Sequence, residues 1–130
     1  MNSKIEFVLD ASALLALLQG EPGAEVVGSM LEESAIGAVN YSEVLSRLIR
    51  RGVDPERAAE VIGSLRVPVL PFDQELARQG SDLARYGWTH GLSLADRACL
   101  ALARQYNVPA VTADAAWEIP GLPVEVRLIR

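Results

Sequence analysis

Five acidic residues stand where an α/β sheet would gather them, directly after a short apolar segment or at the start of a helical one: Asp10, Glu43, Asp73, Asp96 and Asp114. Asp10 is the clearest, because it ends the apolar run 7–9 and precedes an Ala/Leu-rich segment. In open α/β sheets, ligands bind beyond the carboxyl ends of the strands, so carboxylates placed there should converge. Converging carboxylates raise one another's pKa, and a hard divalent cation relieves their repulsion.

The residue types available favour a metal that is bound through oxygen. The chain has one histidine and one cysteine, so no cluster of softer ligands competes with the carboxylates. Mg²⁺ and Mn²⁺ take oxygen ligands, and Mg²⁺ keeps several waters and a place for substrate phosphate. The pattern therefore indicates a magnesium site, with manganese as a substitute.

The same acids also have an ordinary structural interpretation. Asp10, Asp73 and Asp114 could each be the N-cap of the helical segment that follows. Two further segments have the form of a capping box, namely Asn40 to Glu43 and Ser93 to Asp96. A cap stabilises a helix by about 1 kcal/mol, which is reason enough for such a residue. Taken singly, each acid favours capping, and only the convergence of several favours a site.

Short apolar segments alternate with helical ones along the chain. They predict strands over residues 5–9, 35–39, 67–72, 110–112 and 124–129, and helices over 12–19, 22–33, 40–52, 55–65, 73–86 and 93–106, with a short helical turn over 114–117. This alternation predicts an α/β fold with a parallel sheet covered on both faces. Pro68 and Pro71 place the third strand at a sheet edge, because proline cannot donate a ladder hydrogen bond.

Length and composition predict one globular domain spanning residues 1–130. The net charge of −5 argues against a broad basic surface for nucleic acid, although a local one remains open. The lone Cys99 lies on an apolar helix and is expected in the core, and a single cysteine indicates a reducing cytoplasm. We expect no signal peptide, and the apolar run 13–18 is too short for a membrane span.

Four motifs together resemble the PIN-domain ribonucleases, and within them the VapC-type toxins of toxin–antitoxin systems. The motifs are V-L-D-A-S-A-L-L-A-L-L at 8–18, N-Y-S-E-V at 40–44, S-L-A-D-R-A-C-L-A-L-A at 93–103 and V-T-A-D-A-A-W at 111–117. The resemblance covers essentially the whole chain. It implies a three-layer PIN-like fold with a five-stranded parallel sheet of order 3-2-1-4-5. In that order Asp10 and Asp114 are neighbours, and Asp73 is a plain N-cap far away.

The resemblance also implies an activity, a cofactor and partners. The activity is metal-dependent hydrolysis of RNA, with an acidic site formed by Asp10, Glu43, Asp96 and Asp114 and with Ser12 as the accompanying hydroxyl. We expect Asp10 and Asp96 to bind Mg²⁺ directly, and Glu43 and Asp114 to complete the shell through waters or hold a second ion. The implied partners are RNA, a VapB-type antitoxin and a second copy of the chain.

Basic residues near these acids have two interpretations. Arg47, Arg50 and Arg51 cluster on one predicted helix, and Arg97 follows Asp96. They could contact an RNA backbone or form a salt-bridged surface, and the sequence alone favours the salt-bridged surface.

Two other functions remain open at this stage. Haloacid-dehalogenase-type phosphatases also place an aspartate after the first strand, but they need a second aspartate two residues later, where this chain has Ser12. A catalytically silent PIN fold that serves as an RNA-binding or scaffold module is the alternative without enzymatic activity. Loss of one of the four acids would indicate such a module, and all four are present.

Overall fold

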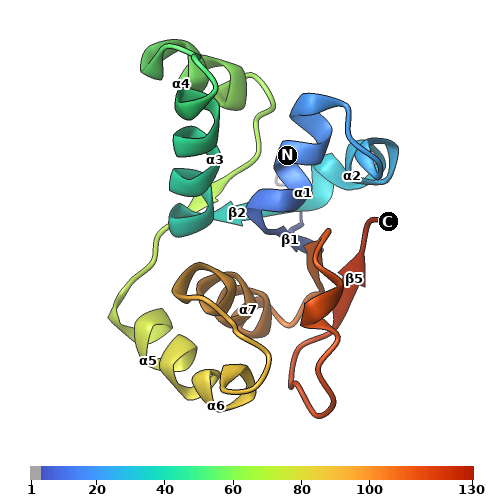
Figure 1. Cartoon of the computed structure of the whole chain (residues 1–130), viewed down its shortest axis with the longest axis vertical. Coiled ribbons are helices and arrows are strands. Elements are labelled where there is room, and N and C mark those ends of the chain that lie inside the picture. Colours follow the sequence, from blue (N-terminus) through green and yellow to red (C-terminus); the bar gives the residue numbers. More distant parts are fainter. Residues whose placement is uncertain (1–3) are drawn as a thin grey trace.

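The computed structural model describes residues 4–130. In this part of the chain, five strands form a parallel sheet of order β3-β2-β1-β4-β5, the order that the resemblance to PIN-domain proteins implies (Figure 1). The strands are β1 (Phe7–Leu9), β2 (Ser34–Gly37), β3 (Val69–Leu70), β4 (Ala110–Thr112) and β5 (Val126–Leu128). In register, Val8 of β1 pairs with Ala35 and Ala110, so β1 is the central strand and its carboxyl end lies beside that of β4.

Helices cover both faces of the sheet. They are α1 (Ala11–Gln19), α2 (Ala24–Met30), α3 (Ala38–Arg50), α4 (Pro55–Gly63), α5 (Gln74–Asp82), α6 (Ala84–Gly87) and α7 (Leu94–Tyr106), with 3₁₀ turns η1 (Leu31–Glu33) and η2 (Ala115–Trp117). Figure 1 shows α1–α4 on one side and α5–α7 on the other. Within residues 4–130, no helix is long and apolar enough to cross a membrane.

The two faces of β1 bury separate cores. Leu9 packs with Ile36 and Val111 against α1–α4, whereas Val8 packs with Ala110 against α5 and α7. Successive residues of a strand point to opposite faces, so a fully apolar strand such as β1 is what a sheet covered on both faces requires. Cys99 is fully buried in the second core, as predicted.

Several helix boundaries differ from the prediction. The predicted helix 22–33 starts at Ala24, because Gly23 at φ +98° does not continue a helix; a Cβ there would lie 2.7 Å from the Ile129 side chain. The predicted helix 73–86 is two helices, α5 and α6. The capping box from Asn40 to Glu43 is wrong: α3 begins at Ala38 directly after β2, so Asn40 lies within its first turn.

Candidate active site

Four predicted acids line one pocket of about 310 Å³. It lies where β1 and β4 end and α1, α3 and α7 begin. We call it the acid pocket; it is lined by Asp10, Ala11, Ser12, Leu15, Gln19, Glu21, Glu43, Arg47, Arg51, Asp96, Asp114 and Arg130. Asp73 is not among these residues and caps α5 instead, as expected. The sequence reasoning missed Glu21 and Arg130, which no motif marks.

Asp10 is the most enclosed of the four acids, with 6% of its surface exposed. Its Oδ1 accepts hydrogen bonds from the backbone N–H of Ala13 (2.9 Å) and the hydroxyl of Ser12 (2.7 Å). Its Oδ2 accepts from Thr112 Oγ1 (2.6 Å) and is also within reach of Ser12 (2.9 Å). The Ser12 hydroxyl has one proton and can donate to only one of the two carboxylate oxygens at a time. Asp10 therefore has three donors, namely Ser12, Ala13 and Thr112, for its roughly four lone-pair sites, and one site stays available for a cation.

Backbone amides orient both hydroxyls toward Asp10. The N–H of Ala113 donates to Ser12 Oγ (2.9 Å), and the N–H of Asp114 donates to Thr112 Oγ1 (3.0 Å). Each hydroxyl therefore accepts from the chain beyond β4 and donates its own proton to the carboxylate. Thr112 was missed as a site residue. Its position two residues before Asp114, at the end of a strand, mirrors that of Ser12 two residues after Asp10 and was the available signal.

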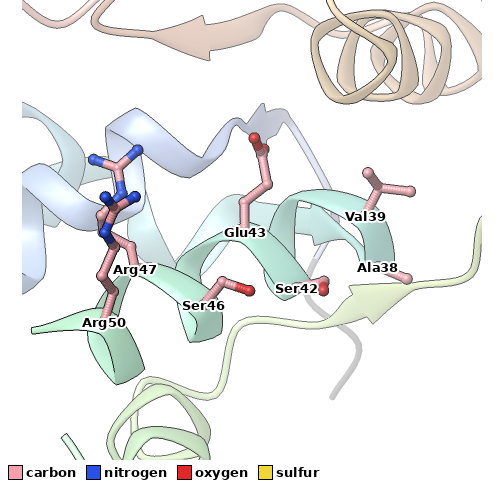
Figure 2. A pocket seen from close by; sticks show the side chains of 7 residues that line it. All are labelled: Ala38, Val39, Ser42, Glu43, Ser46, Arg47 and Arg50. Atoms are coloured by element: carbon pink, nitrogen blue, oxygen red, sulfur yellow. The ribbon is translucent and has the colours of Figure 1, made fainter. Parts of the chain in front are cut away.

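Glu43 is held through Asn40, which lies one turn earlier on α3. The Asn40 amide nitrogen donates to Glu43 Oε1 (3.2 Å) and to the backbone carbonyl of Ala95 on α7 (3.1 Å). Asn40 is 1% exposed, and its Oδ1 has no hydrogen-bond partner within residues 4–130. One buried amide thus joins the starts of α3 and α7 and fixes the carboxylate that Figure 2 shows projecting from α3.

Asp96 and Asp114 each combine a cap with a place in the acid pocket. Asp96 completes a capping box with Ser93, because each residue's backbone N–H donates to the side chain of the other (2.9 and 3.1 Å). Asp114 caps η2 through the N–H of Ala116 (2.9 Å). Capping is therefore confirmed for both, and it leaves carboxylate oxygens free at the helix start.

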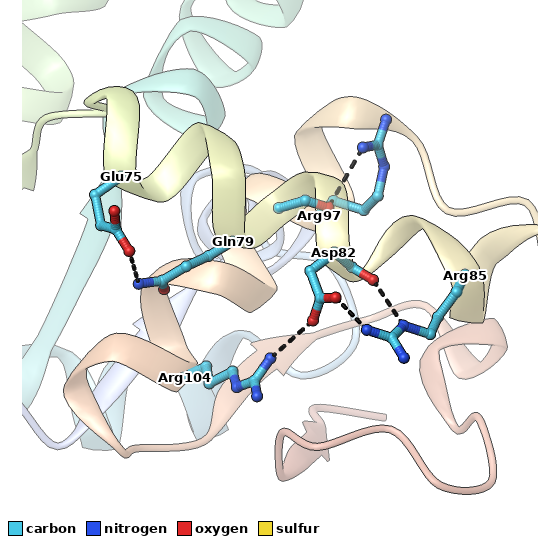
Figure 3. Close-up of polar contacts among 7 residues, drawn as sticks. Glu75, Gln79, Asp82, Arg85, Arg97 and Arg104 are labelled. Carbon is cyan, nitrogen blue, oxygen red and sulfur yellow. Dashed lines mark hydrogen bonds and ion pairs between the residues drawn. The ribbon is translucent and has the colours of Figure 1, made fainter.

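Contacts on the far side of α7 hold that helix against α5. Asp82 of α5 pairs with Arg85 of α6 and with Arg104 of α7 (3.5 Å), as Figure 3 shows. Gly80 faces Arg97, where a Cβ would lie 3.7 Å from the Arg97 carbonyl oxygen, so the two helices approach closely. Exposed ion pairs contribute little to stability, and the close packing therefore does more than the charges to position α7 and Asp96.

Negative charge is concentrated in the acid pocket. Burial raises the pKa of Asp10 above its ordinary value, hydrogen bonds from Thr112, Ser12 and Ala13 oppose that rise, and the charge of Asp96 adds to it. The pKa of Glu43 is raised by partial loss of water and then by the charges of Asp96 and Asp10, against the hydrogen bond from Asn40. Carboxyls that resist ionisation in this way are stabilised as anions by a bound cation.

The donor set suits Mg²⁺. No three acidic, histidine or cysteine side chains among residues 4–130 stand close enough together to form a ready-made metal cage. Mg²⁺ does not require one, because it dehydrates reluctantly and is usually bound by one or two carboxylates together with waters and substrate phosphate. The four carboxylates around one pocket, with an acceptor site left on Asp10, match that mode of binding.

Arginines near the acids are not part of a salt-bridged surface. The ion pairs of the described chain involve Arg57, Arg85, Arg104 and Arg127. Within residues 4–130, no ion pair forms at Arg47, Arg50, Arg51 or Arg97, so the preferred interpretation of these four is wrong. Arg47 and Arg51 line the acid pocket, and Arg97 donates to the carbonyl of Gly80 (3.4 Å).

Comparison with known proteins identifies the family of the chain. The PIN domain family matches residues 7–120, and the chain therefore belongs to that family. No curated protein matches the chain by sequence.

Solved structures share the fold over nearly the full length. The chain is similar to DNA-bound VapBC from Salmonella typhimurium at 20% identity and a TM-score of 0.72, with 97% of this chain and 99% of the other covered. It is similar to FitAcB from Neisseria gonorrhoeae at 21% and 0.69, with 95% and 97% covered. VapC20 from Mycobacterium tuberculosis, a sarcin-ricin loop cleaving toxin, matches at 19% and 0.69, with 85% and 91% covered. At such identities the likeness shows the fold.

Proposed function

We propose that this chain is a magnesium-dependent endoribonuclease that acts as the toxin of a type II toxin–antitoxin pair. The observation that carries the proposal is the acid pocket, where a buried Asp10 held by two hydroxyls shares one cavity with three further carboxylates from other parts of the chain. Membership of the PIN family supports nuclease chemistry. The similarity to VapC20, a toxin that cleaves the sarcin-ricin loop, supports RNA as the substrate class.

Each acid has a proposed role in holding the metal. Asp10 and Asp96 would bind Mg²⁺ or Mn²⁺ directly, and Glu43 and Asp114 would complete the shell through waters or hold a second ion. When bound, the metal supplies an acidified water and stabilises charge on the phosphoryl oxygens. Ser12 keeps the Asp10 carboxylate in one orientation, as its 2.7 Å hydrogen bond indicates.

The remaining chemistry falls to side chains of this protein. A carboxylate of the cluster orients the attacking water and accepts its proton. The water oxygen bonds to phosphorus as the bond to the 3′ oxygen breaks. The departing 3′ oxygen takes a proton from solvent water, which leaves a 5′-phosphate and a 3′-hydroxyl. Arg47, Arg51 and Arg130 line the same pocket and suit the phosphate oxygens of the substrate.

Partners follow from the proposed role. Solved relatives include DNA-bound VapBC from Salmonella typhimurium and a toxin–antitoxin complex from Klebsiella pneumoniae. We infer a VapB-type antitoxin for this chain, a homodimer as the working form, a cytoplasmic location and a single PIN domain over residues 1–130. A light-scattering mass of one chain at micromolar concentration would contradict the dimer.

A pair of isosteric variants tests the site. Asp10 and Asp73 both cap a helix through a 2.9 Å hydrogen bond, but only Asp10 lines the acid pocket. Asp10→Asn should abolish most metal-dependent RNA cleavage while the protein still melts cooperatively, and Asp73→Asn should cleave at the wild-type rate. Retained cleavage in Asp10→Asn with unchanged melting would remove Asp10 from the site.

A further inference from the structure

A second pocket adjoins the acid pocket along α3. This α3 groove has a volume of about 620 Å³ and is lined by Ala38, Val39, Ser42, Glu43, Ser46, Arg47 and Arg50 (Figure 2). Glu43 and Arg47 line both pockets, so the two are continuous. A ligand that reaches the acids can therefore extend along the helix without leaving the protein surface.

Helical spacing arranges the groove residues in two rows. Ser42, Ser46 and Arg50 follow one another at intervals of four residues, and neighbours at that interval lie on one face of a helix. Glu43, Arg47 and Arg51 form the second row, which borders the acid pocket. Figure 2 shows Arg47 and Arg50 projecting from α3 at the end of the groove beyond Ser46.

The polar groups of the groove are free to bind a ligand. Arg47 and Arg50 form no ion pair within the described residues, unlike Arg57, Arg85, Arg104 and Arg127. The hydroxyls of Ser42 and Ser46 also lack a partner in residues 4–130, whereas Ser29, Ser64 and Ser81 bond to the backbone of their own turns. Two free guanidinium forks and two free hydroxyls are donors that match phosphate oxygens.

We propose that the α3 groove binds the sugar–phosphate backbone of single-stranded RNA next to the scissile phosphate, with Arg50 contacting a phosphate outside the acid pocket. The inference rests on the proposed nuclease function. Arg50 lies seven positions after Glu43, which is about 10 Å along a helix. A stacked strand covers that distance in about three nucleotides, so Arg50 contacts the backbone a few nucleotides from the cleavage point.

A protein partner fits the groove less well than RNA does. A helix or peptide that binds in a groove places apolar side chains into apolar pockets. Ala38 and Val39 are the two apolar residues among the seven that line the α3 groove, so the groove offers no row of apolar side chains for a helix to pack against. Phosphate recognition uses the donors that are present. Because the chain as a whole is negatively charged, the attraction for an anion must come from this local group of arginines.

The test compares Arg50→Ala with Arg78→Ala in an RNA-binding assay. Both variants remove one exposed arginine that forms no ion pair in residues 4–130, but Arg78 lies on α5 and lines neither the groove nor the acid pocket. The probe is a fluorescent single-stranded RNA of mixed sequence, titrated at several salt concentrations in chelator so that no cleavage occurs. Melting temperatures of the variants check that each is folded.

Arg50→Ala should weaken binding roughly tenfold, the loss of one charged hydrogen-bond donor. It should also lower the slope of log affinity against log salt by about 0.7, the value for one single-strand phosphate contact. Arg78→Ala should match wild type, and Arg50→Lys should keep the salt slope because it keeps the charge. The proposal is overturned if Arg50→Ala binds RNA as tightly as Arg78→Ala does. The same holds if Arg50→Ala binds RNA normally but loses the binding of a protein antitoxin.

The binding assay separates this proposal from the nuclease itself. If Arg50→Ala binds RNA weakly while the wild-type protein never cleaves RNA, RNA binding by the α3 groove is supported and the nuclease function is contradicted. If the wild-type protein cleaves while Arg50→Ala binds RNA normally, the nuclease function stands and the groove fails.

Discussion

Thr112 donates a hydrogen bond of 2.6 Å to Asp10 although the two residues are 102 positions apart in sequence. The contact joins the carboxyl ends of the neighbouring strands β1 and β4 at the acid pocket. Because the N–H of Asp114 occupies a Thr112 lone pair, the hydroxyl proton is left for the carboxylate. The position of Asp10, one proposed metal ligand, thus depends on β4, the strand that leads to Asp114, another proposed ligand.

Removing the Thr112 hydroxyl should therefore weaken both fold and activity. Thr112→Val keeps the shape of the side chain, leaves Asp10 with one donor fewer in a buried place and leaves the N–H of Asp114 unpaired. We expect a loss of about 1–3 kcal/mol in the free energy of unfolding, measured by denaturant titration, together with slower cleavage. Thr112→Ser restores the hydroxyl and should recover most of both. Equal stability of the valine variant and wild type would show that the hydroxyl does not support Asp10.

Stability of the metal-free protein should fall as pH rises. The raised pKa values of Asp10 and Glu43 mean that the folded protein holds protons which the unfolded chain has already released. Their favourable contribution is thus complete below about pH 4 and is lost as pH rises through the folded pKa values. Glu43→Gln removes one such group, so it should melt above wild type near neutral pH in chelator. A variant that melts at or below wild type there would contradict this sign.

Magnesium should reverse that penalty. A ligand that binds only the folded state raises the melting temperature in proportion to its occupancy. Mg²⁺ should therefore stabilise the wild-type protein, and stabilise Asp96→Asn much less, when each is compared with its own melt in chelator. This comparison within one protein cancels any effect of the substitution on the capping box. An equal shift in both proteins would place the ion away from Asp96.

Asn40 should act as a positioning residue for Glu43. Asn40→Ala removes the donor to Glu43 and the link to the carbonyl of Ala95 on α7. We expect slower turnover at saturating RNA with little change in RNA affinity, since Asn40 is buried and touches no substrate. The groove variant Arg50→Ala should show the opposite split. An Asn40→Ala protein that loses RNA affinity but keeps its turnover would contradict this role.

The sequence could predict elements more securely than contacts. Alternating apolar and helical segments were sufficient for a parallel α/β fold, and the resemblance supplied the strand order that pairing confirms. Asn40 shows the limit: its spacing from Glu43 has the form of a capping box, yet β2 runs directly into α3 and leaves its amide to bind across to α7. The hydrogen-bond partner of a polar side chain depends on how distant segments pack, which local spacing does not show.

Thr112 and the arginines show the same limit. A threonine at the end of an apolar strand is an ordinary strand residue until its neighbour across the sheet is known. Arg47 and Arg50 could be paired with acids or free, and only the arrangement of α3 against the rest of the chain shows that they are free. The sheet edge predicted that acids would converge, and the resemblance selected Asp10, Glu43, Asp96 and Asp114, which share the acid pocket. The groups that hold those acids were not predicted.

The acid pocket is proposed to hydrolyse RNA with the help of a divalent metal. The most direct measurement is cleavage of total cellular RNA by the purified, antitoxin-free chain, with magnesium, with manganese and with chelator, beside Asp96→Asn. We expect discrete fragments with 5′-phosphate ends that require the metal and are absent with the variant. A well-folded chain that binds RNA but leaves it intact under every condition would contradict the claim and indicate a silent RNA-binding module.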